Sequence, residues 1–264
     1  MARENSFTFL GELEGAPVVL FNEETKTYRV TFTLKTLRRS GRVDYPKISI
    51  YSLDEETARK YVTKLKPGSF VQVRGMVATK IVKKPVQCEK CGEISRIDTL
   101  NSEIISYGNP YVFQEEINPA EITEFANSGN LIGSLCTDIQ RRDSASSSTV
   151  AQFQLAVNRR YHVTELEKGS RTDYPWIRVI GNVADECLKR LHKSSQVYIS
   201  GVFQTRDISR HVRCEKCGEE IVYAERVGEV LPMGIEFLNE CLFDNKAKDA
   251  NVKVSYEGSA NEEA

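Results

Sequence analysis

The hexapeptide Cys88-Glu89-Lys90-Cys91-Gly92-Glu93 recurs unchanged as Cys214-Glu215-Lys216-Cys217-Gly218-Glu219. Gly75 and Gly201 lie at the same distance upstream of the two copies, 13 residues before the first cysteine. Further motifs recur in the same order in each half: Thr79 and Thr205, Asp44-Tyr45-Pro46 and Asp173-Tyr174-Pro175, Phe32-Thr33-Leu34 and Phe153-Gln154-Leu155. Repetition in a conserved order with variable loops predicts a duplicated domain.

Each copy shows the same succession of expected elements. In the second copy, residues 150–158 alternate apolar and polar side chains, which predicts a half-buried strand. The elements expected after it are a polar loop at 159–172, a strand at 174–180, a helix at 183–193, a strand at 196–204 with a bend at Gly201, and a return strand at 221–231. The first copy parallels this order, with a helix at 54–66 that Pro67-Gly68 ends.

Three strands, one helix and two more strands is the element order of the OB-fold, a five-stranded Greek-key barrel that binds oligonucleotides or oligosaccharides. We therefore expect an all-β chain with one short helix per repeat and two tandem five-stranded OB-fold barrels. The expected domains are repeat 1 at residues 1–113, a linker at 114–128, repeat 2 at 129–243 and a disordered tail at 244–264, where periodicity is absent.

Composition bounds the class of protein. The chain has 264 residues, 40% of them hydrophobic and 28% charged, with a net charge of −1, which favours packed cores over disorder. No apolar run is long enough to span a membrane and no signal peptide is evident, so we expect a soluble cytoplasmic protein. Seven cysteines without a secretion signal indicate reduced thiols and metal binding more than a disulfide framework.

The second copy resembles the bacterial single-stranded DNA-binding protein family over most of residues 129–207. The pieces that carry the resemblance fall in family order: Asn-Leu-Ile-Gly-Ser-Leu at 130–135, Val-Ala-Gln-Phe-Gln-Leu-Ala-Val-Asn-Arg at 150–159, Thr-Asp-Tyr-Pro-Trp-Ile-Arg-Val at 172–179, and Ser-Gln-Val-Tyr-Ile-Ser-Gly at 195–201, which leads to Gln204-Thr205-Arg206. The first copy is linked to the family through the second. The C-x-x-C hairpins depart from the family, where this hairpin is usually a plain loop.

The resemblance implies sequence-tolerant binding of single-stranded DNA in replication, recombination or repair. It also implies a homodimer, because family members work with four OB-folds and this chain supplies two. The tail ends Glu262-Glu263-Ala264 and lacks the family's acidic tip with a closing hydrophobic residue, so the usual recruitment of protein partners is not expected. Two other functions stay open: a protein-assembly module built from OB-folds and zinc knuckles, and single-stranded RNA binding.

Single-strand binding needs aromatic faces for bases and cations for phosphates. Trp176 and Arg178 alternate with apolar Ile177 and Val179, so they are expected to face outward and to bind nucleic acid. Tyr198, outward by the same alternation, and Phe203, just beyond the Gly201 bend, are further stacking candidates. Trp176 under a loop or at a subunit contact, and Tyr198 at an interface, are the alternatives.

Basic residues cluster beside the same two loops of each copy and are candidate phosphate contacts. In the second copy they are Arg159, Arg160, Arg171, Arg178, Arg206, Arg210 and Arg213; in the first they are Arg38, Arg39, Arg42, Lys47, Arg74, Lys80, Lys83 and Lys84. The copies differ, because Lys47 stands where the second has Trp176 and Ser49 where it has Arg178. We therefore expect the first copy to bind mainly phosphates and the second to supply more of the stacking.

Each C-x-x-C pair is half of a tetrahedral zinc site. Cys88, Cys91, Cys214 and Cys217 together supply four thiolates, enough for about one structural Zn²⁺ per chain. The site can close within the chain or between chains, or each knuckle can find other ligands; redox-active or unpaired thiols are the alternative. No nucleotide-binding, zinc-protease or nucleophile-elbow motif occurs, so the chain is not expected to be an enzyme.

Overall fold

The computed structural model describes residues 4–142, 148–159, 161, 163 and 171–239. The expected tail at 244–264 lies outside these residues, as do Arg160 and Cys241. No helix in the described ranges is both long and apolar enough to cross a bilayer.

The first repeat contains the expected succession of three main strands, a helix and two strands. Its elements are β1 (Glu4–Leu13), β2 (Val18–Asn22), β3 (Thr27–Leu37), β4 (Val43–Asp44), β5 (Lys47–Ser52), α1 (Glu55–Lys64), β6 (Phe70–Gln87), β7 (Ile94–Ser106) and β8 (Tyr111–Val112). The helix begins where the Asp54 carboxylate accepts a hydrogen bond of 2.7 Å from the backbone N–H of Thr57, a capping contact that satisfies one of its free donors.

The second repeat repeats this order after a 3-10 turn, η1 (Pro119–Glu121). Its elements are β9 (Asn127–Leu135), β10 (Gln140–Arg142), β11 (Val150–Asn158), β12 (Thr172–Asp173), β13 (Trp176–Ile180), α2 (Asn182–Arg190), β14 (Gln196–Arg213) and β15 (Glu220–Asn239). The expected linker at 114–128 therefore overlaps the first two residues of β9.

Each repeat closes into its own barrel. In the first barrel, β3 pairs with β1 and with β5, and β6 pairs with β1 and with β7, all antiparallel. The ring closes where β5 and β7 pair in parallel, with Ile48 opposite Ile104. In the second, β13 and β15 close the ring through Ile177 opposite Val230. The architecture is the expected pair of OB-fold barrels with one α-helix each among the described residues.

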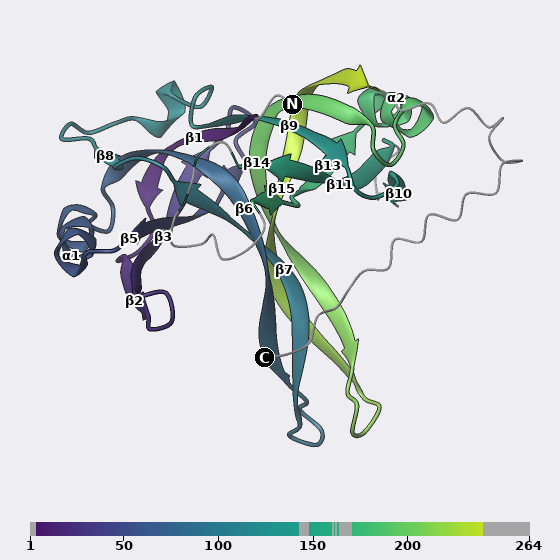
Figure 1. Cartoon of the computed structure of the whole chain (residues 1–264), viewed down its shortest axis with the longest axis horizontal. Coiled ribbons are helices and arrows are strands. Elements are labelled where there is room, and N and C mark those ends of the chain that lie inside the picture. The colour runs from purple at the N-terminus through teal and green to yellow at the C-terminus, as the bar shows by residue number, and fades with distance from the viewer. Residues whose placement is uncertain (1–3, 143–147, 160, 162, 164–170, 240–264) are drawn as a thin grey trace, which may run out of the picture.

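The two barrels share a continuous sheet (Figure 1) and a continuous hydrophobic core. Strands β1 and β9 pair antiparallel, from Glu4 opposite Ile132 to Phe9 opposite Asn127. Phe203 of the second repeat packs edge-on against Phe7 and Phe9 of the first, with ring centroids 6.3 and 6.2 Å apart. Burial of three aromatic rings at this contact fixes the repeats against each other.

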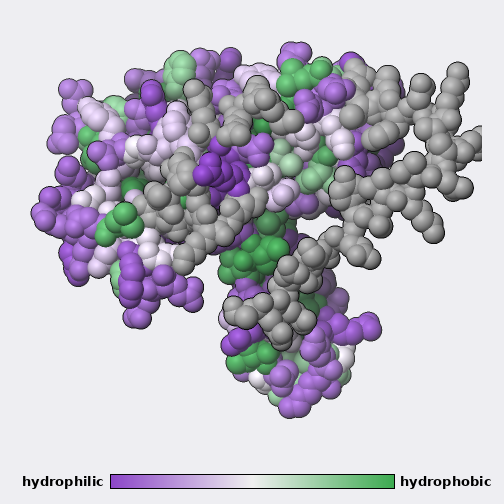
Figure 2. Space-filling view, in the orientation of Figure 1, coloured by the Kyte–Doolittle hydropathy of each residue, from purple (hydrophilic) through white to green (hydrophobic). Residues whose placement is uncertain are grey.

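Two long hairpins leave the barrels side by side (Figure 1). We call residues 79–102, from β6 and β7, the first arm, and residues 205–228, from β14 and β15, the second arm; their strand pairing runs unbroken to Gln87 opposite Ile94 and to Arg213 opposite Glu220. The strand expected at 196–204 thus continues nine residues further, to Arg213. Figure 2 shows the arms as a narrow stalk with hydrophilic and hydrophobic side chains on its surface.

Candidate metal centre and nucleic-acid interface

The arms end in two turns of the same geometry, each formed by one C-E-K-C-G-E hexapeptide. In the first turn the backbone N–H of Cys88 donates to the Glu93 carbonyl (2.8 Å) and that of Gly92 donates to the Cys88 carbonyl (2.9 Å). The second turn repeats both bonds at the same lengths. Gly92 and Gly218 both adopt a φ of +72°, a conformation that glycine reaches without the steric cost of a Cβ.

The turns bring the four predicted cysteine ligands together within one chain. Sγ of Cys88 lies 3.6 Å from Sγ of Cys217, Sγ of Cys91 lies 3.6 Å from Sγ of Cys214, and all four sulfurs lie within 4.8 Å of one another. Four thiolates around a zinc ion at ~2.3 Å form a tetrahedron with sulfurs about 3.8 Å apart. A disulfide needs about 2.05 Å. The spacing and the donor set therefore fit one tetrahedral metal ion.

The charged residues beside the cluster pair in the same way in both directions, because the lysine of each turn lies near a glutamate of the other turn. Nζ of Lys90 lies 2.7 Å from a Glu219 carboxylate oxygen, and Nζ of Lys216 lies 3.7 Å from Glu93. Hydrogen bonds from the backbone N–H groups of Cys217 and Lys216 lower the pKa of the Cys214 thiol to about 7, whereas burial and hydrogen bonds to the other thiols raise the pKa of Cys217 to about 12. Cys214 is therefore the thiol of this pair that ionises first, and the thiolate is the form that binds metal.

The recurring Asp-Tyr-Pro motif lies where the repeats touch, in what we call the seam. The Asp44 carboxylate accepts a hydrogen bond from the Thr205 N–H (2.9 Å), and the Thr205 hydroxyl accepts one from the Tyr45 N–H (2.8 Å). The same pair of bonds recurs with the repeats exchanged: the Asp173 carboxylate accepts a hydrogen bond from the Thr79 N–H, and the Thr79 hydroxyl accepts one from the Tyr174 N–H, both at 2.8 Å. In the sequence these residues stand out only as repeated motifs, with no role indicated.

Two predicted nucleic-acid contacts belong to this seam instead. Nε of Arg38 lies 2.6 Å from the Asp44 carboxylate and Nε of Arg159 lies 2.7 Å from Asp173, with about a tenth of each arginine side chain exposed. Their charges are neutralised by buried carboxylates, so these arginines hold the seam carboxylates in place. The signal that could have found this role was the joint recurrence of the motif and the threonine.

Trp176 lies on the outward face of β13, opposite Gln154 of β11, while Ile177 and Val179 on the same strand are buried. The ring is half-buried, as is Arg178 two residues further along the same face. The alternation thus predicted the facing of this strand correctly. The use of Trp176 and Arg178 in binding stays a prediction.

On each outward face a buried glutamate forms ion pairs with nearby cationic side chains. Glu229 of β15, 1% exposed, lies 2.7 Å from Nε of Arg206 and 4.0 Å from Nε of Arg178. Its counterpart, Glu103 of β7, lies 3.4 Å from Nζ of Lys80. One carboxylate shared by two guanidinium groups leaves the face of the second repeat with a positive charge beside Trp176.

Phe203 is a core residue and not a stacking residue. It is 1% exposed and packs on Phe7 and Phe9. The bend at Gly201 is a β-bulge whose extra residue lies in β15 and not in β14. Ser200 pairs with Gly234 and Gly201 with Pro232, so Met233 between them has no partner in β14. The alternation of β14 therefore continues from Ile199 to Phe203, and the ring faces inward.

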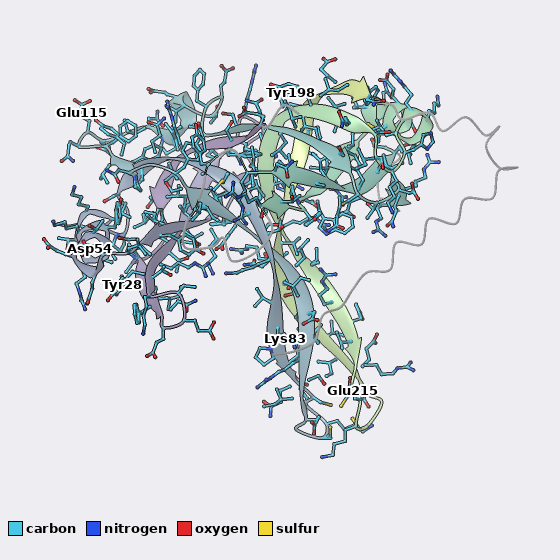
Figure 3. All side chains as sticks on the ribbon, viewed as in Figure 1. Tyr28, Asp54, Lys83, Glu115, Tyr198 and Glu215 are labelled. Atoms are coloured by element: carbon cyan, nitrogen blue, oxygen red, sulfur yellow. The ribbon has the colours of Figure 1, made fainter. Side chains whose placement is uncertain are left out.

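Tyr198 is half-buried and its hydroxyl donates to the Asn130 side chain over 2.9 Å. Figure 3 shows it on the barrels, well away from the two arms, on which Lys83 and Glu215 are labelled. The remaining predicted cations fall into two groups. Those on the arms are Lys80, Lys83, Lys84, Arg206, Arg210 and Arg213, and those on the barrels and their loops are Arg39, Arg42, Lys47, Arg74 and Arg171.

Some of these cations already have partners. Arg210 pairs with Glu225 over 2.8 Å and Arg39 with Glu124 over 3.1 Å, both at the surface. Nζ of Lys84 lies 4.6 Å from the centre of the Tyr223 ring of the other arm, a cation–π distance. Lys47, Lys83, Arg171 and Arg213 are exposed.

Residues 126–228 match the model of the single-strand binding protein family. The second repeat is therefore similar to this family. The matched residues begin at Ala126, take in Trp176, Tyr198 and the second cysteine pair, and end where the second arm returns to its barrel. Single-strand binding proteins are binders and not enzymes, which confirms that part of the prediction.

A curated relative within this family is single-stranded DNA-binding protein 1 of Chlorobaculum tepidum, 40% identical over 76 residues. The aligned stretch covers 29% of this chain and 47% of the relative, so the chain spans about half the length of the curated relative it matches.

Solved structures extend the likeness to both repeats. The wild-type single-stranded DNA binding protein of Thermus aquaticus superposes with a TM-score of 0.58 at 16% identity, covering 89% of this chain and 94% of that one. A deletion mutant of the same protein gives 0.59 at 17% identity, covering 90% and 96%. At this identity the likeness establishes the fold, which confirms the predicted pair of OB-fold domains.

Proposed function

We propose that this protein binds single-stranded DNA with little sequence preference, in replication, recombination or repair. The observation that carries the proposal is Trp176 on the outward face of a barrel whose residues match the model of the single-strand binding protein family. A flat ring stacks on any base, so this mode of binding tolerates sequence.

The cations beside Trp176 support phosphate contacts. Arg178 lies on the same face of β13, two residues along, and Arg206 reaches the same Glu229 carboxylate from β14. Because one buried anion orients two guanidinium groups, their side chains are positioned before DNA binds. Pre-positioned side chains lose less conformational entropy on binding.

The first repeat contributes differently in this proposal. Lys47 is exposed on β5, the strand that corresponds to β13, and Ser49 is buried two residues later. This face therefore offers a cation for phosphates without the stacking surface of the second repeat. We propose repeat boundaries at residues 1–113 and 129–243, a short connector between them, and a homodimer that provides four OB-folds.

We also propose that the four-cysteine cluster holds one structural Zn²⁺ per chain. The support is the donor set, which is soft and all-thiolate, and the sulfur spacing, which matches a tetrahedral ion. The four cysteines would ligate the ion directly, while Lys90 and Lys216 each pair with a glutamate of the opposite turn and so hold the two turns together.

The binding proposal is tested with labelled single-stranded DNA, duplex DNA of equal length and single-stranded RNA, titrated side by side. Single-stranded DNA should bind well above duplex, with an affinity that falls as salt rises. Trp176 is the single tryptophan, so quenching of fluorescence by oligo-dT reports directly on this site. Equal affinity for duplex contradicts the proposal, preference for RNA favours the RNA alternative, and an unchanged signal without binding favours an assembly module.

The metal proposal is tested by metal analysis and thiol titration of the purified, reduced protein. We expect about one zinc per chain, with the four cluster thiols protected until a chelator is added. Zinc near zero with all four thiols titratable contradicts it. A value near two would mean that each knuckle completes its own site.

A further inference from the structure

The four cysteines at the arm tips differ in their exposure to solvent. Cys88 and Cys214, the first cysteine of each turn, are buried, with 1% of each residue exposed. Cys91, the second cysteine of the first turn, is half-buried, and Cys217, the second cysteine of the other turn, is exposed. Each turn therefore has one sulfur that a small molecule in solvent can reach and one that it cannot.

Each accessible sulfur lies beside a buried sulfur of the other arm. Sγ of Cys217 is 3.6 Å from Sγ of Cys88, and Sγ of Cys91 is 3.6 Å from Sγ of Cys214. An accessible thiolate beside a second thiol is the arrangement in which an oxidised sulfur is captured as a disulfide. The duplication of the hexapeptide thus provides two such arrangements, and both of them join one arm to the other.

Contacts that do not involve the sulfurs also hold the two turns together. The lysine of each turn pairs with a glutamate of the other turn, as described above. Val86 of the first arm and Ile221 of the second lie in one buried apolar cluster with Cys88 and Cys214. Because these contacts persist when the metal ligands change, the sulfurs of the two arms remain neighbours.

We propose that the cluster is a site of oxidative modification, at which hydrogen peroxide links the arms through two disulfides, Cys88–Cys217 and Cys91–Cys214. This rests on the metal site proposed above, since four zinc-binding thiolates are the reduced state. Oxidation removes all four ligands, so no donor set is left for the ion. The covalent bonds then join the arm tips in its place, and the arms stay together in both states.

The reaction balances with one peroxide for each disulfide. The accessible thiolate of Cys217 attacks a peroxide oxygen, so that an S–O bond forms, the O–O bond breaks and hydroxide leaves. The thiolate of Cys88 then attacks the sulfenic sulfur, so that an S–S bond forms, the S–O bond breaks and a second hydroxide leaves. Two electrons pass from the two sulfurs to the peroxide, and both hydroxides become water by taking protons from solvent. Cys91 and Cys214 repeat these steps with a second peroxide.

Disulfides within each C-x-x-C pair are the competing outcome, and they would leave the arms separate. Such bonds must draw together two sulfurs of one turn, whose backbone is held by the Cys88 and Gly92 N–H groups and by their counterparts in the second turn. Between the arms, the sulfurs pass from 3.6 Å to about 2.05 Å as two whole turns approach each other. This movement changes neither turn internally, so the structure favours the links between arms.

Peptide mapping reads the connectivity directly, because trypsin cleaves after Lys90 and after Lys216, inside the two hexapeptides. The four cysteines then fall in four different peptides, 84–90, 91–96, 214–216 and 217–226. The zinc-loaded protein is treated with two equivalents of hydrogen peroxide, its remaining thiols are alkylated, and the masses of the unreduced digest are measured. We expect 84–90 linked to 217–226 and 91–96 linked to 214–216, with four thiols lost and the zinc released.

Single-cysteine variants separate the two outcomes independently of yield. Cys217→Ser should form only the link between Cys91 and Cys214, whereas pairing within turns predicts a link between Cys88 and Cys91. Cys91→Ser should likewise form only the link between Cys88 and Cys217. Cys136→Ser, outside the cluster, is the matched control and should form both links as the wild type does.

Thermal unfolding of the wild type gives a second readout that needs no variant. A bond between residues 129 apart in the sequence restricts the unfolded chain far more than a bond within a C-x-x-C pair. The oxidised, zinc-free protein should therefore melt at a higher temperature than the reduced, chelated protein, and dithiothreitol should abolish the difference. Affinity for oligo-dT, followed by Trp176 fluorescence, should be unchanged by oxidation and lowered by chelation.

Links within the turns, or sulfinic acids without any link, overturn this inference and leave the metal proposal standing if zinc was present before oxidation. A covalent dimer formed by links between chains overturns it as well. Zinc near zero in the untreated, reduced protein overturns the metal proposal, and the connectivity map then decides by itself whether the arms are joined by oxidation.

Discussion

The two repeats use equivalent residues where they touch each other and different residues where they face outward. At the seam, Asp44 and Asp173 make the same bonds to Thr205 and Thr79, and at the arm tips the two hexapeptides make the same turns. On the outward strands, by contrast, β5 begins with Lys47 at the position where β13 begins with Trp176.

The difference follows from the approximate two-fold relation between the repeats. A contact across such an axis is made twice, so a change in one copy leaves its partner group in the other copy unsatisfied. The outward faces meet solvent or ligand and carry no such reciprocal constraint. Contacts that join the repeats are therefore expected to stay alike, and the outward surfaces are free to specialise.

The largest expected effect is on zinc content, and it tests whether the two arms contribute equally to one metal site. Cys88→Ser and Cys214→Ser should each reduce zinc from about one per chain to near zero, because either change removes one of four ligands from a single site. Thermal stability should fall in both, and single-strand affinity should fall indirectly as the arms separate. Metal analysis and thermal unfolding measure this, with Cys136→Ser as the control outside the cluster.

Zinc retained by one of the two variants would mean that the arms do not share one ion. Zinc lost from the Cys136→Ser control as well would point to general unfolding.

The seam provides the next effect in size. Asp44→Ala and Asp173→Ala should each lower the free energy of unfolding by about 3–5 kcal/mol, since each leaves a mostly buried arginine without its carboxylate. Denaturant titration measures the loss. Asp207→Ala, which breaks an exposed pair with Arg226, should change stability little. Strongly unequal losses at Asp44 and Asp173 would contradict the equivalence of the two halves of the seam.

Trp176 should show the functional difference between the outward faces. Trp176→Ala should weaken binding to oligo-dT by about 1–3 kcal/mol, the contribution of one base stack, with an unchanged circular dichroism spectrum. Tyr111→Ala, which removes an exposed aromatic ring from β8, serves as the control and should bind normally. Unchanged affinity in Trp176→Ala would assign this ring to a subunit contact.

Lys47 should give the smallest effect. Lys47→Ala removes a phosphate contact and no stacking surface, so binding should weaken equally for all sequences and the salt slope should fall by about 0.7. Fluorescence titrations at several salt concentrations measure both. Lys47→Trp sharpens the comparison, because it should raise affinity for oligo-dT if the faces differ only in stacking surface. A loss from Lys47→Ala as large as that from Trp176→Ala would show that the faces contribute alike.

Sequence patterns were most informative where structure depends on near neighbours. Alternation along residues 150–158 and around Trp176 predicted which side chains are buried, since successive residues of a strand point to opposite faces. The same reasoning did not decide whether Phe203 faces the core or the solvent, because a bend in β14 does not reveal which of two paired strands carries the extra residue of the bulge. Met233 of β15 carries it, some thirty residues away.

The roles of Arg38 and Arg159 could not be predicted from charge. Isolated arginines look alike in a sequence whether they meet phosphates or a buried carboxylate. What distinguishes them is the position of Asp44 and Asp173, which is set by the pairing of β1 with β9 and by the packing of Phe203 between the repeats. The contact between the Tyr107 and Tyr161 rings, whose centroids lie 4.5 Å apart, could not be predicted for the same reason, because the two residues come from different repeats.

The sequence by itself determined the duplication, the order of elements in each barrel and the supply of four thiolates, because these depend on local periodicity and on motifs of fixed spacing. It also determined that the arms are of equal length, since 13 residues separate Gly75 from Cys88 and Gly201 from Cys214. Only the tertiary structure decided that the cysteine pairs meet within one chain, that the repeated aspartates form the seam and that the Tyr107 and Tyr161 rings of different repeats meet. Each of these contacts joins residues far apart in the chain, and their distance depends on how the two barrels are placed by strand pairing and core packing.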